Sequence, residues 1–155
     1  MRNLLALLLA LLFCFSCVTS YAEGSRESSP QESVLKNGDY EYVVDEDGNA
    51  KLLSYSWDSH KDGGDVIIPS VIDGHSVKTI GTHCFAPDTN VEVGSFVIPD
   101  TVSIIEQQAI YKLKINNIML PQDVAEIAHG AIVANYRTIS LARDNSNYTV
   151  VENAL

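Results

Sequence analysis

Val66-Ile67-Ile68-Pro69 is the first of four copies of a four-residue sequence pattern, the first phrase. The later copies are Phe96-Val97-Ile98-Pro99, Ile118-Met119-Leu120-Pro121 and Ile139-Ser140-Leu141-Ala142, the last without its proline. The second, third and fourth copies begin 22 and then 21 residues apart. A period of about 22 residues predicts a solenoid, in which each unit is too small to bury its own apolar face and stacks on its neighbours.

A second phrase, with valine and isoleucine three residues apart, follows each of the first three copies: Val77-Lys78-Thr79-Ile80, Val102-Ser103-Ile104-Ile105 and Val124-Ala125-Glu126-Ile127. The first phrase is β-branched with a period of two, which predicts a strand with alternate side chains directed inward. Proline then turns the chain out of the sheet, and the second phrase is expected to return along the other side of the coil. Residues 109–113 are predicted to form a short helical turn. These features predict a leucine-rich-repeat solenoid, mainly β with short helical turns, over residues 66–155.

A β-hairpin is predicted ahead of the repeats, within residues 38–65. Tyr40–Val44 alternates in polarity, Asp47-Gly48 is a strong turn pair, and Lys51–Trp57 supplies the return strand. The acidic turn also resembles a calcium loop, but Ala50 and Ser56 stand where such a loop needs glycine and glutamate. The hairpin is expected to cap the apolar end of the first repeat.

The N-terminus predicts export. Residues 1–22 read as a signal peptide, with Arg2 before an apolar run and small residues before a cleavage site near Ala22. Residues 23–37 are polar and serine-rich, which predicts a flexible tether. The protein is therefore expected to be secreted or held at a bacterial cell surface. Lipid anchoring at Cys17 is a minor alternative, because the residues before it match a lipobox poorly.

Residues 40–155 resemble the BspA-like, bacterial surface-antigen type of leucine-rich repeat. The resemblance rests on the strand phrases, on Val77-Lys78-Thr79-Ile80-Gly81 and on Cys84-Phe85 with its counterparts Ala109-Ile110 and Ala131-Ile132. The glycine and the phenylalanine survive only in the first unit, so the later units are degenerate. The resemblance implies an exported or surface-exposed protein that acts in adhesion or recognition of a protein or glycan, with no catalytic residues to carry over.

Composition and motifs give no indication of an enzyme, a cofactor or a metal site. The chain has 10 Lys and Arg against 20 Asp and Glu, a net charge of −10, which argues against nucleic acid as a partner. The four histidines lack the spacing that places two ligands on one face. Cys84 occupies a core position of the repeat, which predicts burial rather than reactivity.

The outward positions of the repeated strands are the candidate partner-binding residues. Ile67, Val97, Met119 and Ser140 are expected to form a ladder across the sheet, with three apolar side chains in succession that either contact a partner or lie under a neighbouring loop. Tyr111, Tyr136 and Arg137, placed in the connections, are residue types that interfaces favour. The predicted function is non-catalytic recognition of an extracellular protein or glycan. The alternative is a structural array that forms a homo-oligomer through an open C-terminal end.

Overall fold

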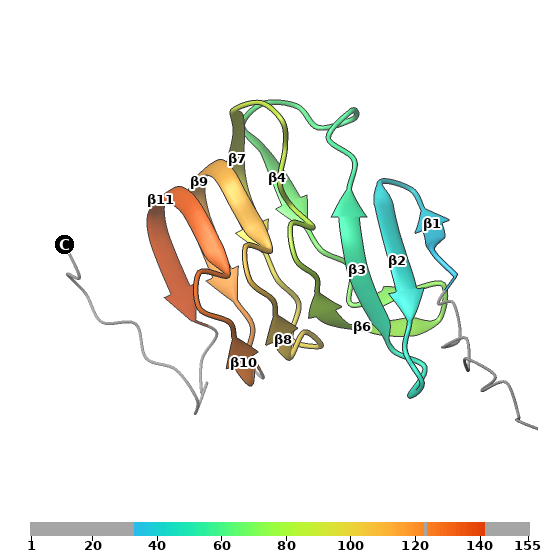
Figure 1. The fold of residues 1–155 in the computed structure, drawn as a ribbon. Helices are drawn as coiled ribbons and strands as arrows, with labels where there is room; N and C mark the ends of the chain where they lie inside the picture. The colour runs from blue at the N-terminus through green and yellow to red at the C-terminus, as the bar shows by residue number, and fades with distance from the viewer. Residues whose placement is uncertain (1–32, 123, 142–155) are drawn as a thin grey trace, which may run out of the picture. The chain divides into compact units, whose positions relative to one another are not determined.

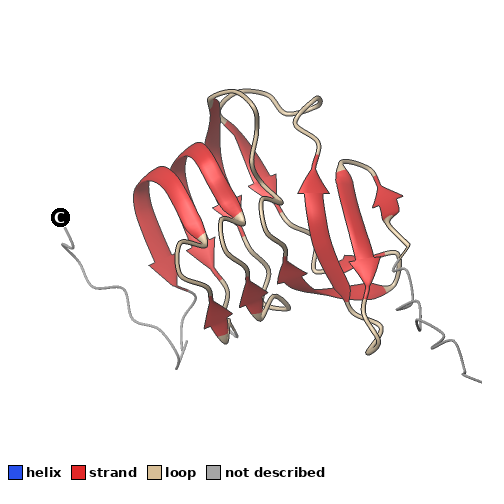
Figure 2. Cartoon of the chain, viewed as in Figure 1, coloured by secondary structure: helices blue, strands red, loops and turns tan. Residues whose placement is uncertain are grey.

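The computed structural model describes residues 33–122 and 124–141, and in these residues the chain forms eleven strands and no helix (Figures 1 and 2). One sheet has the order β1-β2-β3-β6-β8-β10, with β5 beside β6, and the other has the order β11-β9-β7-β4. The strands are β1 (Leu35–Asn37), β2 (Tyr40–Val44), β3 (Ala50–Tyr55), β4 (Gly64–Ile67), β5 (Val71–Ile72), β6 (His75–Ile80), β7 (Val91–Val97), β8 (Ile104–Ile105), β9 (Ile110–Leu120), β10 (Glu126–Ile127) and β11 (Ile132–Leu141).

The four copies of the first phrase become neighbouring parallel strands of the second sheet. Phe96 of β7 pairs with Val66 of β4 and with Ile118 of β9, and Ile118 in turn pairs with Ile139 of β11. Figure 1 shows these four strands side by side. From β7 onward the sequence period of about 22 residues is therefore the step from one strand of the sheet to the next.

The second phrase forms the parallel part of the first sheet. Ile80 at the end of β6 pairs with Ile105 of β8, and Ile105 pairs with Ile127 of β10. The backbone ladder continues one residue further, because the N–H of Glu106 donates to the carbonyl of Ile80 and the N–H of Ala128 donates to that of Ile105. Each of the first three repeats thus contributes one of these parallel strands to each sheet.

The phased apolar positions form one core between the two sheets. Strand residues of the first phrase meet valine and isoleucine of the second phrase, and Cys84 and Phe85 with their counterparts fill the space between. The largest fully buried side chains include Tyr42, Leu52, Ile68, Ile80, Phe85, Phe96, Ile105, Ile110, Leu113 and Ile118. Burial of this surface is the main stabilising contribution of such a fold.

The hairpin of β2 and β3 lies at the first repeat. The two strands pair antiparallel, and β3 also pairs in parallel with β6, so that Leu52 lies beside Ile80. Gly81 approaches β3 closely because it has no side chain. The N–H of Gly81 donates to the carbonyl oxygen of Leu52, and a Cβ added at Gly81 would lie 2.6 Å from that oxygen. A side chain at this position would therefore collide with the hairpin backbone.

Aromatic and polar contacts join the hairpin to the repeats. The ring of Phe85 lies 5.3 Å from that of Tyr55 and 4.9 Å from that of Phe96, between centroids. The Asp73 carboxylate accepts hydrogen bonds from the Tyr42 hydroxyl and from the Asn37 side-chain amide, both at 2.6 Å. Asp73 lies in the turn between β5 and β6, so this contact fastens the edge of the first repeat to the hairpin.

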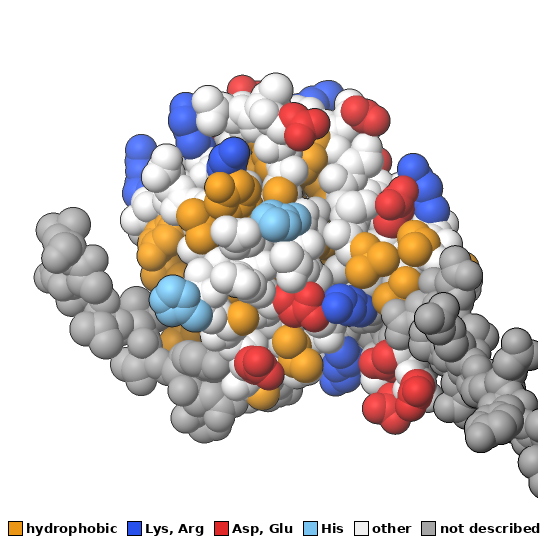
Figure 3. Space-filling model, in the orientation of Figure 1, with side chains coloured by type: hydrophobic (Ala, Val, Ile, Leu, Met, Phe, Trp, Pro, Cys, Tyr) orange, Lys and Arg blue, Asp and Glu red, His pale blue; other side chains and the backbone are white. Residues whose placement is uncertain are grey.

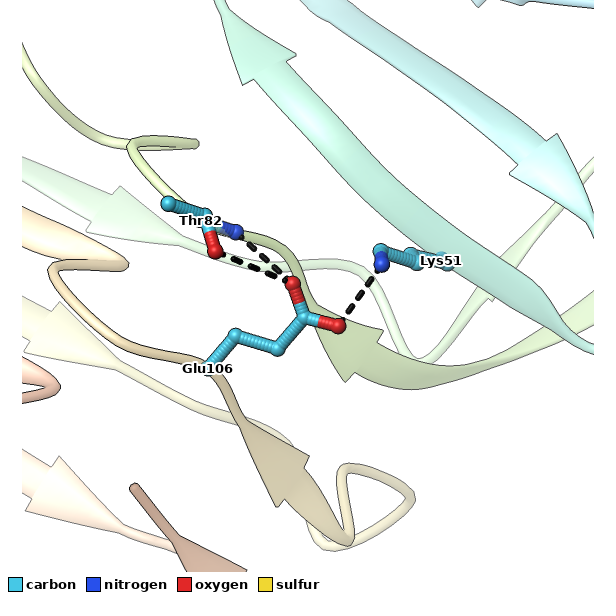
Figure 4. Close-up of polar contacts among 3 residues, drawn as sticks. All are labelled: Lys51, Thr82 and Glu106. Carbon is cyan, nitrogen blue, oxygen red and sulfur yellow. Dashed lines mark hydrogen bonds and ion pairs between the residues drawn. The ribbon is translucent and has the colours of Figure 1, made fainter. Parts of the chain in front are cut away.

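A second polar contact joins β3 to the second repeat (Figure 4). Glu106 accepts from the ammonium of Lys51 at 2.6 Å with one oxygen, and from the backbone N–H and the hydroxyl of Thr82 with the other. Partial burial acts to raise the pKa of Glu106, but the hydrogen bonds from Lys51 and Thr82 and the charge of Lys51 outweigh it, so the pKa lies below its ordinary value.

Two sequence-based predictions of structure were wrong. Residues 109–113 do not form a helical turn: Ile110–Leu120 is a continuous strand, because its buried residues can pair with the strands on both sides. The polar tether does not extend to residue 37, since Leu35–Asn37 forms β1 against β2. Gly38, at a φ of +56°, supplies the tight turn that folds β1 back onto β2.

The predicted signal peptide, the cleavage site and Cys17 lie outside the described residues. Among the residues that are described, no helix is long and apolar enough to cross a membrane.

Candidate binding surface

The outward ladder of the β4-β7-β9-β11 sheet exists in register. Ile67 pairs with Val97, Val97 with Met119, and Met119 with Ser140. Side chains that pair across parallel strands point to the same face. Ile67 is 65% exposed and Met119 is 43% exposed, while Val97 and Ser140 are half-buried. No loop of the described chain therefore covers the two ends of the apolar row.

A shallow hollow of about 400 Å³ adjoins the Ile67 end of this row. Tyr40, Pro69 and the exposed Val71 are among the residues that line it. The Tyr40 hydroxyl donates to the carbonyl oxygen of Ile67 at 3.3 Å, and burial raises the pKa of this tyrosine. The apolar row thus continues from the sheet to Pro69 and to Val71 at the start of β5.

The other half of the same sheet is polar, and a bulge shapes it. Between Val133 and Asn135 of β11 the pairing with β9 shifts by one residue, and Lys112 of β9 has a φ of +58°. Bulges redirect the side chains around them. Here Lys112 and Lys114 are both exposed on either side of the buried Leu113. Both ammonium groups are therefore available to solvent on this half of the sheet.

Two adjoining hollows lie at this polar half. One has a volume of about 500 Å³ and the other about 380 Å³, and both are lined by Lys114, Asn135 and Tyr136. Lys112 and Asn90 complete the polar lining of the first. The polar residues that line only the second are Glu92, Asn116 and Arg137.

Three candidate residues lie in strands, not in connections as predicted. Tyr111 is in β9, and Tyr136 and Arg137 are in β11. The prediction placed them wrongly because it limited each strand to its phrase, whereas β9 and β11 begin eight and seven residues before it. Tyr111 is partly occupied by its own neighbours: the His83 ring lies 5.8 Å away and the Lys112 ammonium 5.0 Å away. Tyr136 and Arg137 are exposed.

The sequence analysis missed the two lysines and the three asparagines of the hollows. In β9, Lys112, Lys114 and Asn116 alternate with buried Leu113 and Ile115, a pattern that is visible in the sequence once the strand is extended. The register shift that brings Asn135 beside Lys114 has its trace in the change of the repeat period from 22 to 21 residues.

Cys84 and possible metal ligands are the features of the described residues that bear on catalysis. Cys84 is buried, and that burial raises the pKa of its thiol, which disfavours the nucleophilic thiolate. No group of three or more His, Cys, Asp or Glu residues within ranges 33–122 and 124–141 could hold a metal ion. The exposed sheet face, with an apolar row at one end and a polar half at the other, is the surface suited to binding.

Comparison with known proteins gives similarity in structure alone. No protein-family model matches the chain, and no curated protein matches it in sequence. A leucine-rich repeat protein from Bacteroides capillosus superposes with a TM-score of 0.45 at 22% identity, over 72% of this chain and 99% of that one. A leucine-rich cell surface protein from Faecalibacterium prausnitzii superposes with a TM-score of 0.38 at 17% identity, over 75% of this chain and 44% of that one. At this level neither likeness places the chain in a family.

Proposed function

We propose that this chain is an exported leucine-rich-repeat solenoid that recognises an extracellular protein or glycan without catalysis, through the outward face of the β4-β7-β9-β11 sheet. The observation that carries the proposal is the in-register row of Ile67, Val97 and Met119, whose end members are exposed. Adjacent apolar side chains on an open sheet face are a common mark of an interaction site.

The repeat architecture supports this role. Equivalent positions of successive units come together on one face, so a small change in each unit changes one rung of a continuous surface. The inward positions of these strands form the core, whereas outward positions such as Ile67 and Met119 are exposed. The location at the bacterial cell surface rests on the predicted signal peptide and on the resemblance to BspA-like repeats.

Binding to a defined panel of extracellular matrix proteins and glycans, measured at two salt concentrations, tests the proposal. Replacement of Ile67, Val97 and Met119 by serine should leave the fold intact, by circular dichroism and thermal melting. It should weaken binding about tenfold, because a few apolar contacts carry most of the affinity of an interface. Val34→Ser, at an exposed apolar residue away from this sheet, is the control and should bind as the parent does.

Two results would count against this assignment. Unchanged binding by the triple serine variant would remove the row from the interface. Loss of the fold would show that these side chains belong to the core. Weak dependence of the parent's binding on salt is expected if the apolar row dominates, because apolar contacts are not screened.

A structural alternative rests on a different observation. Inward positions of β11, such as Ile132, Ile139 and Leu141, are only partly buried, whereas their counterparts in β9 are buried. A second copy that stacks on β11 would cover them and give a homo-oligomer. Light scattering at high protein concentration separates the two: a stable monomer contradicts stacking.

A further inference from the structure

The polar half of the binding face has the opposite charge balance to the rest of the chain. The sequence carries twice as many acidic as basic residues. The two adjoining hollows of β9 and β11 nevertheless bring together three cations, Lys112, Lys114 and Arg137, with Glu92 as the one carboxylate that lines them. Figure 3 shows Lys and Arg side chains gathered at the upper left, over β9 and β11, and acidic side chains at the lower right, near the β2–β3 turn. This is a local positive surface on an acidic protein.

The cations are only lightly engaged within the described chain. Lys114 pairs with Glu92 at 3.2 Å, but both side chains are more than half exposed, so the pair contributes little and can rearrange for a ligand. The Lys112 ammonium lies 5.0 Å from the Tyr111 ring, a contact that leaves its donors free for an anion. No ion pair to Arg137 is formed by the residues that the structure describes.

Three carboxamides accompany the cations. Asn90 and Asn135 line the first hollow, and Asn135 and Asn116 line the second. None of their side chains makes a hydrogen bond within the described residues. A carboxamide offers both donors and an acceptor. Because Asn135 pairs with Lys114 across the strands, cation and carboxamide project from the same face of the sheet.

We propose that these two hollows bind an acidic polysaccharide, with its carboxylate or sulfate groups against Lys112, Lys114 and Arg137 and its hydroxyls against the asparagines. This inference rests on the proposed recognition function and names the ligand class. Charge-assisted hydrogen bonds to anionic oxygens are stronger than neutral ones. The shallow, open form of adjoining hollows suits an extended chain of sugars that crosses strands β9 and β11.

The carboxamides favour a polysaccharide over an acidic peptide. Sugar hydroxyls donate and accept, which matches the mixed donors and acceptor of each asparagine, whereas carboxylate side chains only accept. The negative charge of the rest of the chain would repel a polyanion, so binding depends on this local cluster and should fall as salt rises.

The test measures binding of the full exported chain to four immobilised polymers: dextran sulfate, which is sulfated; polygalacturonate, which is carboxylated; neutral dextran; and polyglutamate. The variant Lys112→Gln/Lys114→Gln/Arg137→Gln should bind the acidic polysaccharide about tenfold more weakly. The matched control Lys36→Gln/Lys61→Gln/Lys78→Gln removes the same number of charges from residues that line neither hollow, and should bind nearly as the parent does. Asn116→Ala/Asn135→Ala should weaken binding without a change in its salt dependence.

Binding to dextran sulfate or polygalacturonate but not to dextran, lost in the first variant and kept in the control, supports the inference, and the two arms distinguish sulfate from carboxylate. Equal loss in both triple variants shows a general charge effect and overturns it. Equally strong binding of polyglutamate overturns it in favour of an acidic peptide. If no acidic polymer binds while another ligand is lost in the Ile67/Val97/Met119 serine variant, this inference fails and the proposed recognition function stands.

Discussion

The inner strands and the outermost described strands of the two sheets place the same residue types in equivalent positions with different burial. Ile110 and Ile132 pair across β9 and β11, but Ile110 is fully buried and Ile132 only partly. The same contrast separates Ile105 from Ile127. Ile127 and Ile132 lie in β10 and β11, the outermost described strands of the two sheets, so full burial of these two positions requires a strand on each side.

The first repeat shows how an end is closed. Val77 and Ile80 are as buried as residues of the middle repeat, because β3 pairs with β6 and brings Ala50 and Leu52 against them. The hairpin therefore substitutes for a preceding repeat. It differs from one in being fastened by side-chain hydrogen bonds, of which those to Asp73 and Glu106 are the most direct.

The largest expected effect is a difference in the free energy of unfolding between the same Ile→Ala substitution at two equivalent positions. Ile110→Ala should lower the free energy of unfolding by about 2–5 kcal/mol, because it leaves a cavity in a filled core. Ile132→Ala should cost about 1 kcal/mol, since that side chain is already partly exposed. Denaturant titration of the two variants measures this difference. Equal losses would mean that Ile132 is covered as completely as Ile110.

A smaller effect should come from the contact between the hairpin and the turn of β5 and β6. Hydrogen bonds from Tyr42 and Asn37, with the charge of His75, hold the pKa of Asp73 below its ordinary value of 3.8. The pKa of Tyr42 is raised above 10.0, mainly by the hydrogen bond to Asp73 and to a smaller extent by burial. The lowered pKa of Asp73 stabilises the fold above about pH 4, and this contribution is lost as pH falls through the folded value. The raised pKa of Tyr42 stabilises the fold below pH 10, and its contribution is lost as pH rises through the folded value.

Asp73→Asn tests this contact: asparagine tolerates the φ of +47° at this position, removes the negative charge, and replaces one of the two accepting oxygens by an amide nitrogen that cannot accept. The melting temperature should fall at neutral pH, and its decrease below pH 4 should become shallower. Asp47→Asn, in the turn between β2 and β3, is the control and should leave the pH profile of the parent unchanged. An unchanged profile in Asp73→Asn would show that the Asp73 contact does not help to hold the hairpin.

The repeated positions of the sequence predict part of the fold and one part of the candidate binding surface. The first phrase and the second phrase predict the paired strands, because apolar residues such as Phe96, Ile118 and Ile139 recur at a regular spacing. Regular spacing of apolar residues indicates directly which positions are buried. The ladder of Ile67, Val97, Met119 and Ser140 follows from the same phase. The length of β9 does not, because Tyr111–Asn117 has no repeated phrase and is held as strand by β7 and β11.

The polar hollows depend on structure that a single repeat does not encode. Lys112 is in a left-handed backbone conformation that lysine rarely adopts, and it is held there by the pairing on both sides of the bulge. The clustering of Lys114 with Asn135 depends on the one-residue shift of register at that bulge. Residue types in these positions predict an exposed strand face, and only the register brings them together.

The smallest expected effect compares two ion pairs. Glu106→Gln keeps an acceptor for Thr82 but loses the charge that faces Lys51, and with side chains 37% and 31% exposed the pair should contribute about 0.5–1 kcal/mol. Glu92→Gln breaks a pair that is 55% and 57% exposed and should change stability less. Because the pKa of Glu106 lies below its ordinary 4.5, its contribution is present above that pH and is lost as pH falls through the folded value. Denaturant titrations in low and high salt should show that Glu106→Gln lowers the free energy of unfolding less in high salt. Equal losses for Glu106→Gln and Glu92→Gln would mean that Glu106 does not fasten the hairpin.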